Sequence, residues 1–192
     1  AQRLSREISQ AMQRLGMSGG VFEVELKPLE PADAGASGLE QVEFMVSANP
    51  GLPLQPLSKV ASGGELSRIS LAIQVATIRY GQTPTLVFDE VDVGIGGGVA
   101  EIVGQMLRQL GETRQILCVT HLPQVAAQAE HHLQVQKSIS RQQTRTEITA
   151  LDEAARVHEI ARMLGGVEIT DQTLAHASEM VRLASASAGV DD

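Results

Sequence analysis

Three groups of polar residues in this chain have the types and spacing that phosphate chemistry requires. The first is the turn Ser62-Gly63-Gly64, which stands directly before a long apolar-periodic run. The first backbone amides of a helix lack partners within the helix, and the helix dipole is positive there, so such a turn suits an anion. Taken alone, the turn fits a phosphate contact and an ordinary capped helix about equally well.

The other two groups each follow a short apolar run. Asp89-Glu90 comes after residues 85–88, and His121 comes after residues 115–119. Asp89 can hold Mg²⁺ through water, Glu90 can orient or deprotonate an attacking water, and His121 can hydrogen-bond a terminal phosphate. A carboxylate pair or a single histidine is usually structural or solvated, but the three groups in this order favour a nucleotide site.

The elements between these groups predict how they come together. The apolar runs 85–88 and 115–119 are typical of parallel strands buried on both faces. Residues 65–80, with an apolar face that includes Leu66 and Ile69, and residues 99–110 have helical periodicity. We therefore predict an α/β fold with a mainly parallel sheet flanked by helices, and ligands in such sheets bind at the carboxyl ends of the strands.

The remaining segments predict an antiparallel fringe and further helices. Residues 2–15 have helical spacing, residues 21–26 and 41–46 alternate as two antiparallel strands, and residues 49–56 are irregular. Residues 133–136 and 144–151 are predicted strands around a mildly basic turn with Arg141 and Arg145. Helices are expected at 152–164, ending at Gly165-Gly166, and from Thr170 or Asp171 to about residue 184, followed by a frayed tail.

Composition limits the classes of function. The 192 residues are 43% hydrophobic but only 2% aromatic, and the net charge is −8. The core must be aliphatic, and neither a broad basic face nor aromatic stacking platforms for nucleic acid are expected. The single cysteine, Cys118, excludes an internal disulfide and is predicted to be a reduced core thiol. Without a signal peptide or a membrane-length apolar run, we expect a cytosolic protein.

Several strings resemble ATP-binding-cassette ATPases. Residues 62–65 (SGGE) resemble their signature motif, residues 86–90 (LVFDE) their Walker B strand, and residues 119–121 (VTH) their switch histidine. Longer strings at 56–68 (PLSKVASGGELSR), 118–127 (CVTHLPQVAA) and 159–166 (EIARMLGG) resemble one branch closely. That branch is the RecN family of bacterial DNA repair proteins, which is related to the structural-maintenance-of-chromosomes (SMC) family, and the resemblance covers almost the whole chain.

The resemblance implies specific roles. Ser62 and Gly64, with Gly63 and Glu65 in the same motif, would contact the γ-phosphate of ATP held by the opposing head of a homodimer. The metal and catalytic groups would be Asp89 on the Mg²⁺ side, Glu90 as the catalytic carboxylate and His121 as the γ-phosphate sensor.

Residues 92–97, including Asp92, Gly94 and Gly96, would form the D-loop between the two heads. Gly96 stands where the family's aspartate is usual, which leaves this loop its backbone rather than that side chain.

The chain contains no G-x-x-x-x-G-K-[ST] string, so it has no phosphate-cradling P-loop of its own. In the resembled family the P-loop lies in an N-terminal lobe beyond a long coiled coil. We therefore interpret residues 1–16 as the end of that coiled coil and residues 17–192 as the C-terminal lobe of the head. The expected partners are the P-loop lobe, a second copy joined through sandwiched ATP, and DNA, with no membrane.

The whole protein would act in double-strand break repair and recombination at the bacterial nucleoid, and this lobe alone would be inactive. Two alternatives remain open at this stage. The chain could be a non-catalytic scaffold lobe that keeps the ATPase shape only to pair with a partner, or the head lobe of another SMC- or Rad50-like protein. Glu90 and His121 favour catalysis, because a scaffold needs neither.

Overall fold

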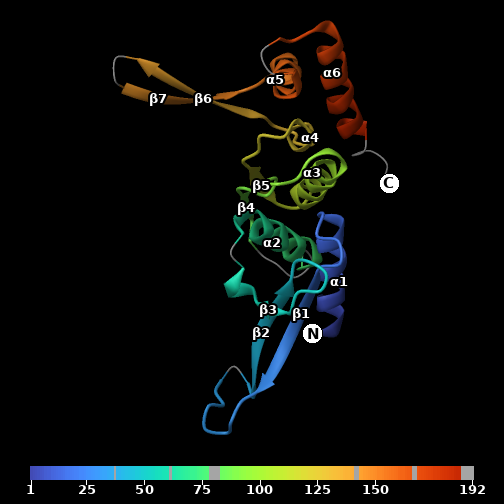
Figure 1. The fold of residues 1–192 in the computed structure, drawn as a ribbon. Coiled ribbons are helices and arrows are strands. Elements are labelled where there is room, and N and C mark those ends of the chain that lie inside the picture. Colours follow the sequence, from blue (N-terminus) through green and yellow to red (C-terminus); the bar gives the residue numbers. More distant parts are fainter. Residues whose placement is uncertain (37, 61, 78–82, 141–142, 166–167, 187–192) are drawn as a thin grey trace. The chain divides into compact units, whose positions relative to one another are not determined.

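The computed structural model describes residues 1–36, 38–60, 62–77, 83–140, 143–165 and 168–186, and it confirms the predicted α/β class (Figure 1). The chain divides into two compact units, Ala1–Val119 and Thr120–Asp192, and each is described by itself. Predicted features at Ala61, Ile78, Tyr80, Arg141, Gly166 and residues 187–192 lie outside the described residues.

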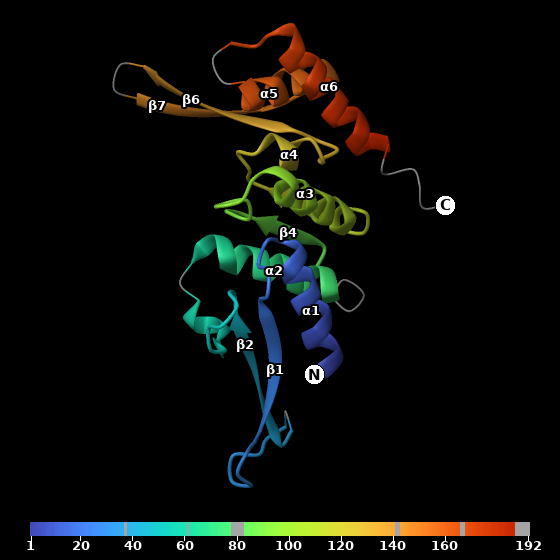
Figure 2. The same cartoon turned by 45° about the vertical axis from the view of Figure 1, so that its right-hand side comes forward.

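The first unit begins with the predicted helix and the two predicted antiparallel strands, and a short third strand lies in residues 49–56, which were predicted to be irregular. Helix α1 (Gln2–Arg14) precedes strands β1 (Val21–Pro28), β2 (Glu40–Ser47) and β3 (Gln55–Pro56), which pair in the order β1-β2-β3. Figure 2 shows α1 running alongside β1. A short 3₁₀ turn, η1 (Leu57–Lys59), then leads the chain toward the Ser62 turn.

Two serines of α1 complete the outer edge of this sheet. The backbone amide of Phe22 donates to Ser9 Oγ at 2.9 Å, and the amide of Val24 donates to Ser5 Oγ at 2.9 Å. A sheet edge otherwise presents unpaired amides. The helix therefore satisfies the β1 edge with hydroxyls, while it buries Ile8 and Met12 on its apolar side.

The hairpin of β1 and β2 is buried only at its root. Phe22 and Val46, which pair across the strands, are each 1% exposed. Farther along the hairpin, Leu26 is 43% exposed and its cross-strand neighbour Val42 is 57% exposed. The alternation in the sequence thus predicted the strands correctly, but a covered apolar face exists only where α1 reaches.

The second part of this unit contains the parallel strands. Strand β4 (Thr85–Phe88) pairs in parallel with β5 (Gln115–Cys118), so that Phe88 lies beside Cys118. Helix α2 (Gly63–Thr77) leads into β4, and helix α3 (Gly97–Gly111) connects the two strands. Parallel pairing among the described strands is confined to β4 and β5, and the other pairs are antiparallel.

The burial predictions for this region were wrong for the strands and right only in part for α2. Neither β4 nor β5 is covered on both faces, because Val87 is 66% exposed and Leu117 is 44% exposed, while Phe88 is 5% exposed. On helix α2, Ile69 is fully buried as predicted, but Leu66 is 43% exposed, and Leu71 and Ala72 are fully buried instead. Periodicity identifies the elements, but which face is covered depends on the neighbours that tertiary packing supplies.

The second unit pairs helices with a hairpin. It contains α4 (Pro123–Ala126), β6 (Leu133–Ser140), β7 (Gln143–Ala150), α5 (Glu153–Gly165) and α6 (Asp171–Ala186). Side chains cap both long helices, since the amide of Ala155 donates to Asp152 Oδ1 at 2.8 Å and the amide of Thr173 to Thr170 Oγ1 at 3.2 Å. The core of this unit includes Ala126, Ala127, Ile160, Ala161, Ala177 and Val181.

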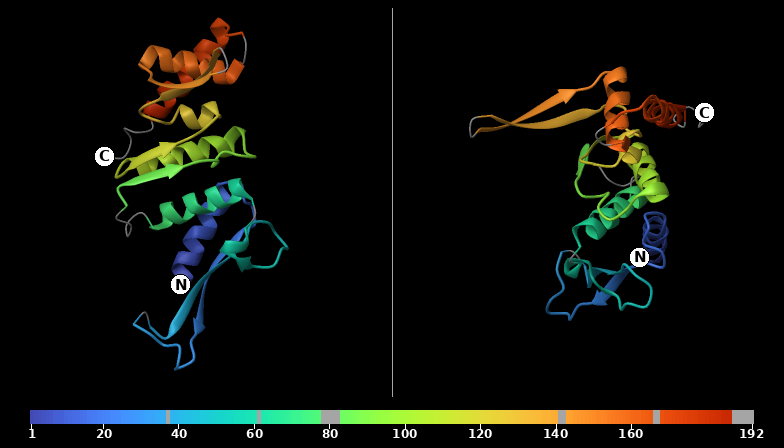
Figure 3. Two further views of the ribbon diagram at one scale, coloured as in Figure 1. Left: turned by 90° about the vertical axis from the view of Figure 1, so that its left-hand side faces the viewer. Right: turned by 45° about the horizontal axis from the view of Figure 1, so that its top comes forward.

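Strands β6 and β7 form a long antiparallel hairpin that extends away from α5 (Figure 3). The predicted strands are confirmed. Strand β6 is longer than the expected 133–136, whereas β7 has the expected length and begins one residue earlier. Leu133, Val135 and Ile148 share one face of the hairpin and are 54%, 60% and 63% exposed. The hairpin therefore has an open apolar face, and it is attached to the unit at its base.

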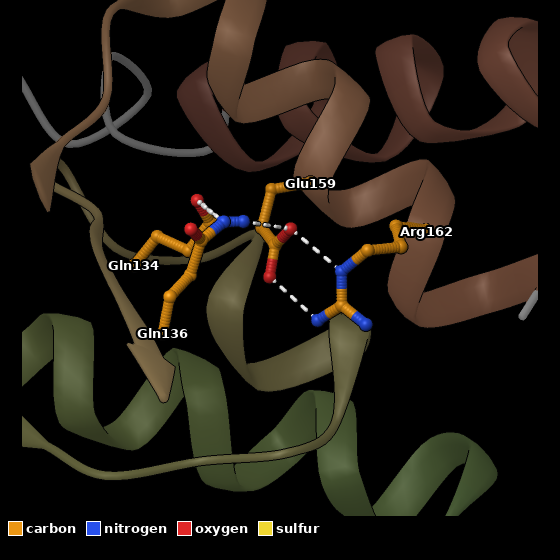
Figure 4. Close-up of polar contacts among 4 residues, drawn as sticks. All are labelled: Gln134, Gln136, Glu159 and Arg162. Atoms are coloured by element: carbon orange, nitrogen blue, oxygen red, sulfur yellow. Dashed lines mark hydrogen bonds and ion pairs between the residues drawn. The ribbon is translucent and has the colours of Figure 1, made fainter. Parts of the chain in front are cut away.

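A polar cluster ties that base to α5 (Figure 4). Glu159 is 8% exposed and accepts two hydrogen bonds from Arg162, from Nε at 2.8 Å and from Nη2 at 2.7 Å. Gln134 of β6 donates to the same carboxylate at 2.5 Å, and Gln136 donates to Gln134. The carboxylate thus links the strand and the helix.

The surroundings of this cluster shift the pKa values of two groups, Glu159 and His132. The hydrogen bonds from Arg162 lower the pKa of Glu159 below its ordinary value, which means that the folded unit favours the ionised carboxylate. Burial, with a contribution from the Arg156 guanidinium, lowers the pKa of His132. Arg156 is itself held by the carbonyl of Ala127 at 2.7 Å. Both pKa values are lowered by folding, so the folded unit binds fewer protons than the unfolded chain. Lowering the pH therefore reduces the free energy of unfolding of this unit.

We predict that Glu159→Ala lowers the free energy of unfolding by ~1–3 kcal/mol, because it leaves the partly buried donor of Gln134 without its acceptor. The contribution of Glu159 should be complete above its ordinary pKa of 4.5 and disappear as the pH falls through the lowered folded-state value. Urea denaturation at pH 7 and at pH 3.5 measures both effects. Glu179→Ala, at an exposed position on α6, is the control, and an equal loss in the two variants would contradict the prediction.

Candidate functional site

The Ser62 turn forms the start of α2, as predicted. The backbone amide of Glu65 donates to Ser62 Oγ at 3.4 Å, and the amide of Leu66 donates to the Ser62 carbonyl at 3.0 Å. Ser62 is exposed, so its hydroxyl lies at the surface beside the first helical amides. The turn therefore has the geometry of a helix start that is open to an anion.

The carboxylate pair Asp89-Glu90 follows the end of β4 and lies in a strained turn. Asp89 Oδ1 accepts the backbone amide of Glu90 at 2.9 Å, and both side chains are exposed. Glu90 has φ +58°, the only positive φ among the described non-glycine residues. For an L-residue with a long side chain this left-handed conformation costs about 1–2 kcal/mol. Neighbouring contacts must therefore hold Glu90 in place.

The two motifs meet in the fold. A Cβ atom added to Gly63 would lie 2.5 Å from Glu90 Oε2, and one added to Gly64 would lie 3.0 Å from the carbonyl oxygen of Val93. A methyl group on Gly63 would require the end of the Glu90 side chain to move, and one on Gly64 would be in tight contact with backbone. The double glycine thus serves a close approach of the helix start to the loop of residues 89–93, and the Glu90 carboxylate lies directly against the signature-like turn.

Two further residues, which sequence reasoning did not single out, hold the same loop. Ser67 Oγ donates to the carbonyl of Asp89 at 2.8 Å, and Arg68 Nη1 donates to the carbonyl of Val93 at 2.7 Å. Burial lowers the pKa of Arg68, an effect that Glu65 partly offsets. Their spacing was available in the sequence, because residues four apart share a helix face and Ser67 and Arg68 follow Gly63 and Gly64 by four.

The segment predicted as a D-loop follows the strained turn. The Val93 amide donates to the Glu90 carbonyl at 3.2 Å, and Asp92 is 2% exposed. Gly94 has φ +74°, whereas Gly96 is extended and precedes the first turn of α3. A Cβ on either glycine would meet nothing within 4 Å. The backbone at Gly94 and Gly96 is therefore unobstructed, whereas the side chain of Asp92, the one carboxylate of this loop, is buried.

The buried carboxylate of Asp92 affects the nearby thiol. Burial first, and then the charges of Asp92 and Asp89, raise the pKa of Cys118 to about 12. The thiol is free, and it stays protonated at physiological pH. The residue is only partly buried, so it agrees in part with the predicted core thiol.

His121 stands at the start of the other unit. It is exposed and precedes α4, and Thr120 fixes the local turn by accepting the amide of Leu122 at 3.0 Å. The structure thus brings the Ser62 turn together with Asp89, Glu90 and Val93 within one unit. The joining of His121 to them remains a prediction.

The donor set fits Mg²⁺ only as part of a larger site. No group of three or more His, Cys, Asp or Glu side chains gathers as a metal site within the described part of the chain. Mg²⁺ in nucleotide sites usually has one or two protein carboxylates, with waters and phosphates completing its shell. Asp89 is exposed and has one oxygen engaged by the Glu90 amide, so its carboxylate suits this arrangement.

Comparison with known sequences gives consistent matches, although no protein-family model matches the chain. The chain is 51% identical over 181 residues to DNA repair protein RecN of Vibrio cholerae, a match covering 94% of this chain and 32% of that protein. It is 39% identical over 197 residues to DNA repair protein RecN of Bacillus subtilis, covering 96% and 34%. The chain thus spans about a third of the length of the curated relatives it matches.

Comparison with solved structures gives the same fold. The Smc head domain with a coiled coil and joint from Pyrococcus yayanosii matches with TM-score 0.59 and 19% identity, covering 83% of this chain and 28% of that one. The Smc head domain from Pyrococcus furiosus, bound to the C-terminal domain of ScpA, matches with TM-score 0.56 and 21% identity, covering 84% and 38%. At these identities the likeness shows the fold of an SMC-type head. None of the described helices is both long and apolar enough to cross a membrane.

The close approach of the turn to the loop predicts different outcomes for the two glycines. Gly64→Ala should lower the free energy of unfolding by ~1–3 kcal/mol, because its new methyl group meets the backbone of Val93. Gly63→Ala should change it by less than about 0.5 kcal/mol, because the methyl group meets only the movable end of Glu90. Urea denaturation followed by circular dichroism measures both. A larger loss for Gly63→Ala than for Gly64→Ala would disprove the packing described.

Proposed function

We propose that this chain, which belongs to the RecN family of DNA repair proteins and corresponds to their C-terminal part, is one lobe of an SMC-like ATPase head. In a dimer this lobe contacts the ATP that is bound by the opposing head. The observation that carries the proposal is the contact of the Gly63-Gly64 turn with the Glu90 loop. A helix start open to anions and a carboxylate at a strand end lie side by side there.

In the proposed assembly each lobe serves two nucleotides. Ser62, Gly63, Gly64 and Glu65 contact the γ-phosphate of an ATP bound by the opposing head, because backbone amides and a hydroxyl at a helix start suit that charge. Asp89 and Glu90 act on the nucleotide of their own head. ATP is thereby sandwiched between two copies, and hydrolysis separates them.

The chemistry assigned to this chain is modest. Glu90 orients the attacking water and accepts its proton, and its exposed position leaves it accessible to solvent. Asp89 holds Mg²⁺ through water, and the ion when bound supplies charge neutralisation for the phosphates. His121 donates a hydrogen bond to the γ-phosphate. The backbone of residues 92–97, with Asp92, Gly94 and Gly96, lines the passage between the heads.

The lobe depends on a partner lobe for nucleotide binding. It has no P-loop sequence, so the phosphates and most of the affinity come from the P-loop lobe of the same protein. Residues 1–16 are the end of the coiled coil in this scheme, and residues 17–192 form the lobe. The whole protein acts on DNA during double-strand break repair in the bacterial cytoplasm, at the nucleoid. With a net charge of −8, this lobe is not the main DNA-binding surface.

We predict that Glu90→Gln in the full-length protein lowers steady-state ATP turnover by ~10²–10⁴-fold, the usual range for loss of a general base. ATP-driven association of the heads should persist, because the phosphate-reading turn is intact. A coupled phosphate-release assay measures turnover, and crosslinking across the heads measures association. Glu101→Gln, at an exposed position on α3, is the control. Unchanged turnover in Glu90→Gln would remove Glu90 from this role.

A second substitution separates the proposal from a scaffold that merely keeps the ATPase shape. Ser62→Arg introduces a bulky cation at the exposed start of α2 and should abolish ATP-dependent association in the full-length protein. A scaffold lobe would associate regardless of nucleotide and tolerate the change. Light scattering with and without ATP distinguishes the two, with Ser70→Arg as the matched exposed control on the same helix. Full association of Ser62→Arg would favour the scaffold.

A further inference from the structure

Two consecutive side chains of α2 hold both ends of the loop that carries Glu90. Ser67 Oγ donates to the carbonyl of Asp89 at 2.8 Å, before Glu90, and Arg68 Nη1 donates to the carbonyl of Val93 at 2.7 Å, after it. Arg68 is only 9% exposed. Because both acceptors are backbone carbonyls, the bonds fix the course of the loop and leave its side chains available.

Glu90 requires such support. Its φ of +58° is a left-handed conformation that a glutamate rarely adopts without support. Within the loop, the amide of Glu90 is held by Asp89 Oδ1 at 2.9 Å and its carbonyl by the amide of Val93 at 3.2 Å. These bonds close the turn on itself, but they do not attach it to the rest of the unit. Ser67 and Arg68 provide that attachment.

We infer that Ser67 and Arg68 are positioning residues for the catalytic carboxylate, and that they connect it mechanically to the phosphate-reading turn of the same lobe. The inference rests on the proposed function and deepens it. Each of the two side chains donates its hydrogen bond to a backbone carbonyl of the loop. They act through the backbone of the loop, and the same helix that starts at Gly63 carries both of them.

The connection follows from the stiffness of a helix. Ser67 lies five residues after Ser62, a separation of ~7.5 Å along a helix that rises 1.5 Å per residue. When Ser62 engages a phosphate on the opposing head, a shift of the first turn of α2 is carried directly to the carbonyls of Asp89 and Val93. Glu90, whose Oε2 lies against Gly63, moves with them. Contact of Ser62 with the ATP of the opposing head thus changes the position of Glu90, which acts on the ATP of its own head.

The test uses Ser67→Ala in the full-length protein. Removal of this hydroxyl deletes one neutral hydrogen bond, so kcat for ATP hydrolysis should fall about 3- to 10-fold. KM for ATP should stay within about twofold, and ATP-driven head association should be retained, because no nucleotide contact is lost. Ser67→Thr keeps the hydroxyl and should restore kcat. Ser70→Ala, an identical change at an exposed position one turn later, should behave as wild type.

A double-mutant cycle with Glu90 separates positioning from general damage. If Ser67 acts through Glu90, adding Ser67→Ala to Glu90→Gln lowers turnover no further, whereas independent effects would multiply. Multiplicative losses, or an unchanged kcat in Ser67→Ala, would overturn the inference while the large effect of Glu90→Gln still upheld the proposed function. If Glu90→Gln instead left ATP turnover unchanged, the proposed function itself would be refuted. Arg68→Lys, which keeps the charge but not the guanidinium geometry, should reproduce the kcat loss.

Discussion

The contact between the double-glycine turn and the loop after β4 is the constraint on which the first unit depends. The start of α2 lies this close to the loop because Gly63 and Gly64 have no side chains. A methyl group on Gly64 would press against the backbone of Val93, and one on Gly63 would displace the end of the Glu90 side chain. This approach brings Ser67 and Arg68 within hydrogen-bonding distance of the loop carbonyls. Those bonds in turn support the left-handed conformation of Glu90. The position of the helix start, the strained backbone of Glu90 and the two hydrogen bonds to its loop are consequences of one close packing.

The second unit attaches a strand to a helix through a buried carboxylate rather than through close backbone packing. It holds a long hairpin to a helix by a carboxylate, Glu159, that is buried yet fully engaged by Arg162 and Gln134. A buried charge is costly unless its lone pairs are satisfied. The hydrogen bonds here satisfy it and lower its pKa. The attachment of the hairpin is therefore polar and directional, whereas the helices behind it pack through small apolar side chains such as Ala161 and Ala177.

Exposed apolar surface is extensive on the strands of both units. Val87 and Val119 are more than 60% exposed, and Leu133 and Ile148 are more than half exposed. The curated relatives are about three times longer than this chain. A chain that forms one lobe of a larger head is expected to leave apolar faces for its other parts, since a monomeric protein seldom exposes so many large aliphatic side chains on its strands. Val87 of β4 and Leu117 of β5, which were predicted to lie on covered faces, belong to this exposed surface.

The sequence by itself determined the order and type of most elements, the start of the last helix at Thr170 or Asp171, and the motifs at 62–65 and 89–90. These depend on local chemistry: periodicity, turn residues, and hydroxyl or carboxylate side chains at helix starts. Only the tertiary structure decided which helix face is buried, that Glu90 is left-handed, and that Ser67 and Arg68 clamp its loop. Ser67 and Asp89 are 22 residues apart, and a sequence pattern records only neighbours. Contacts across such distances follow from packing, in which the space left by Gly63 and Gly64 is the deciding quantity.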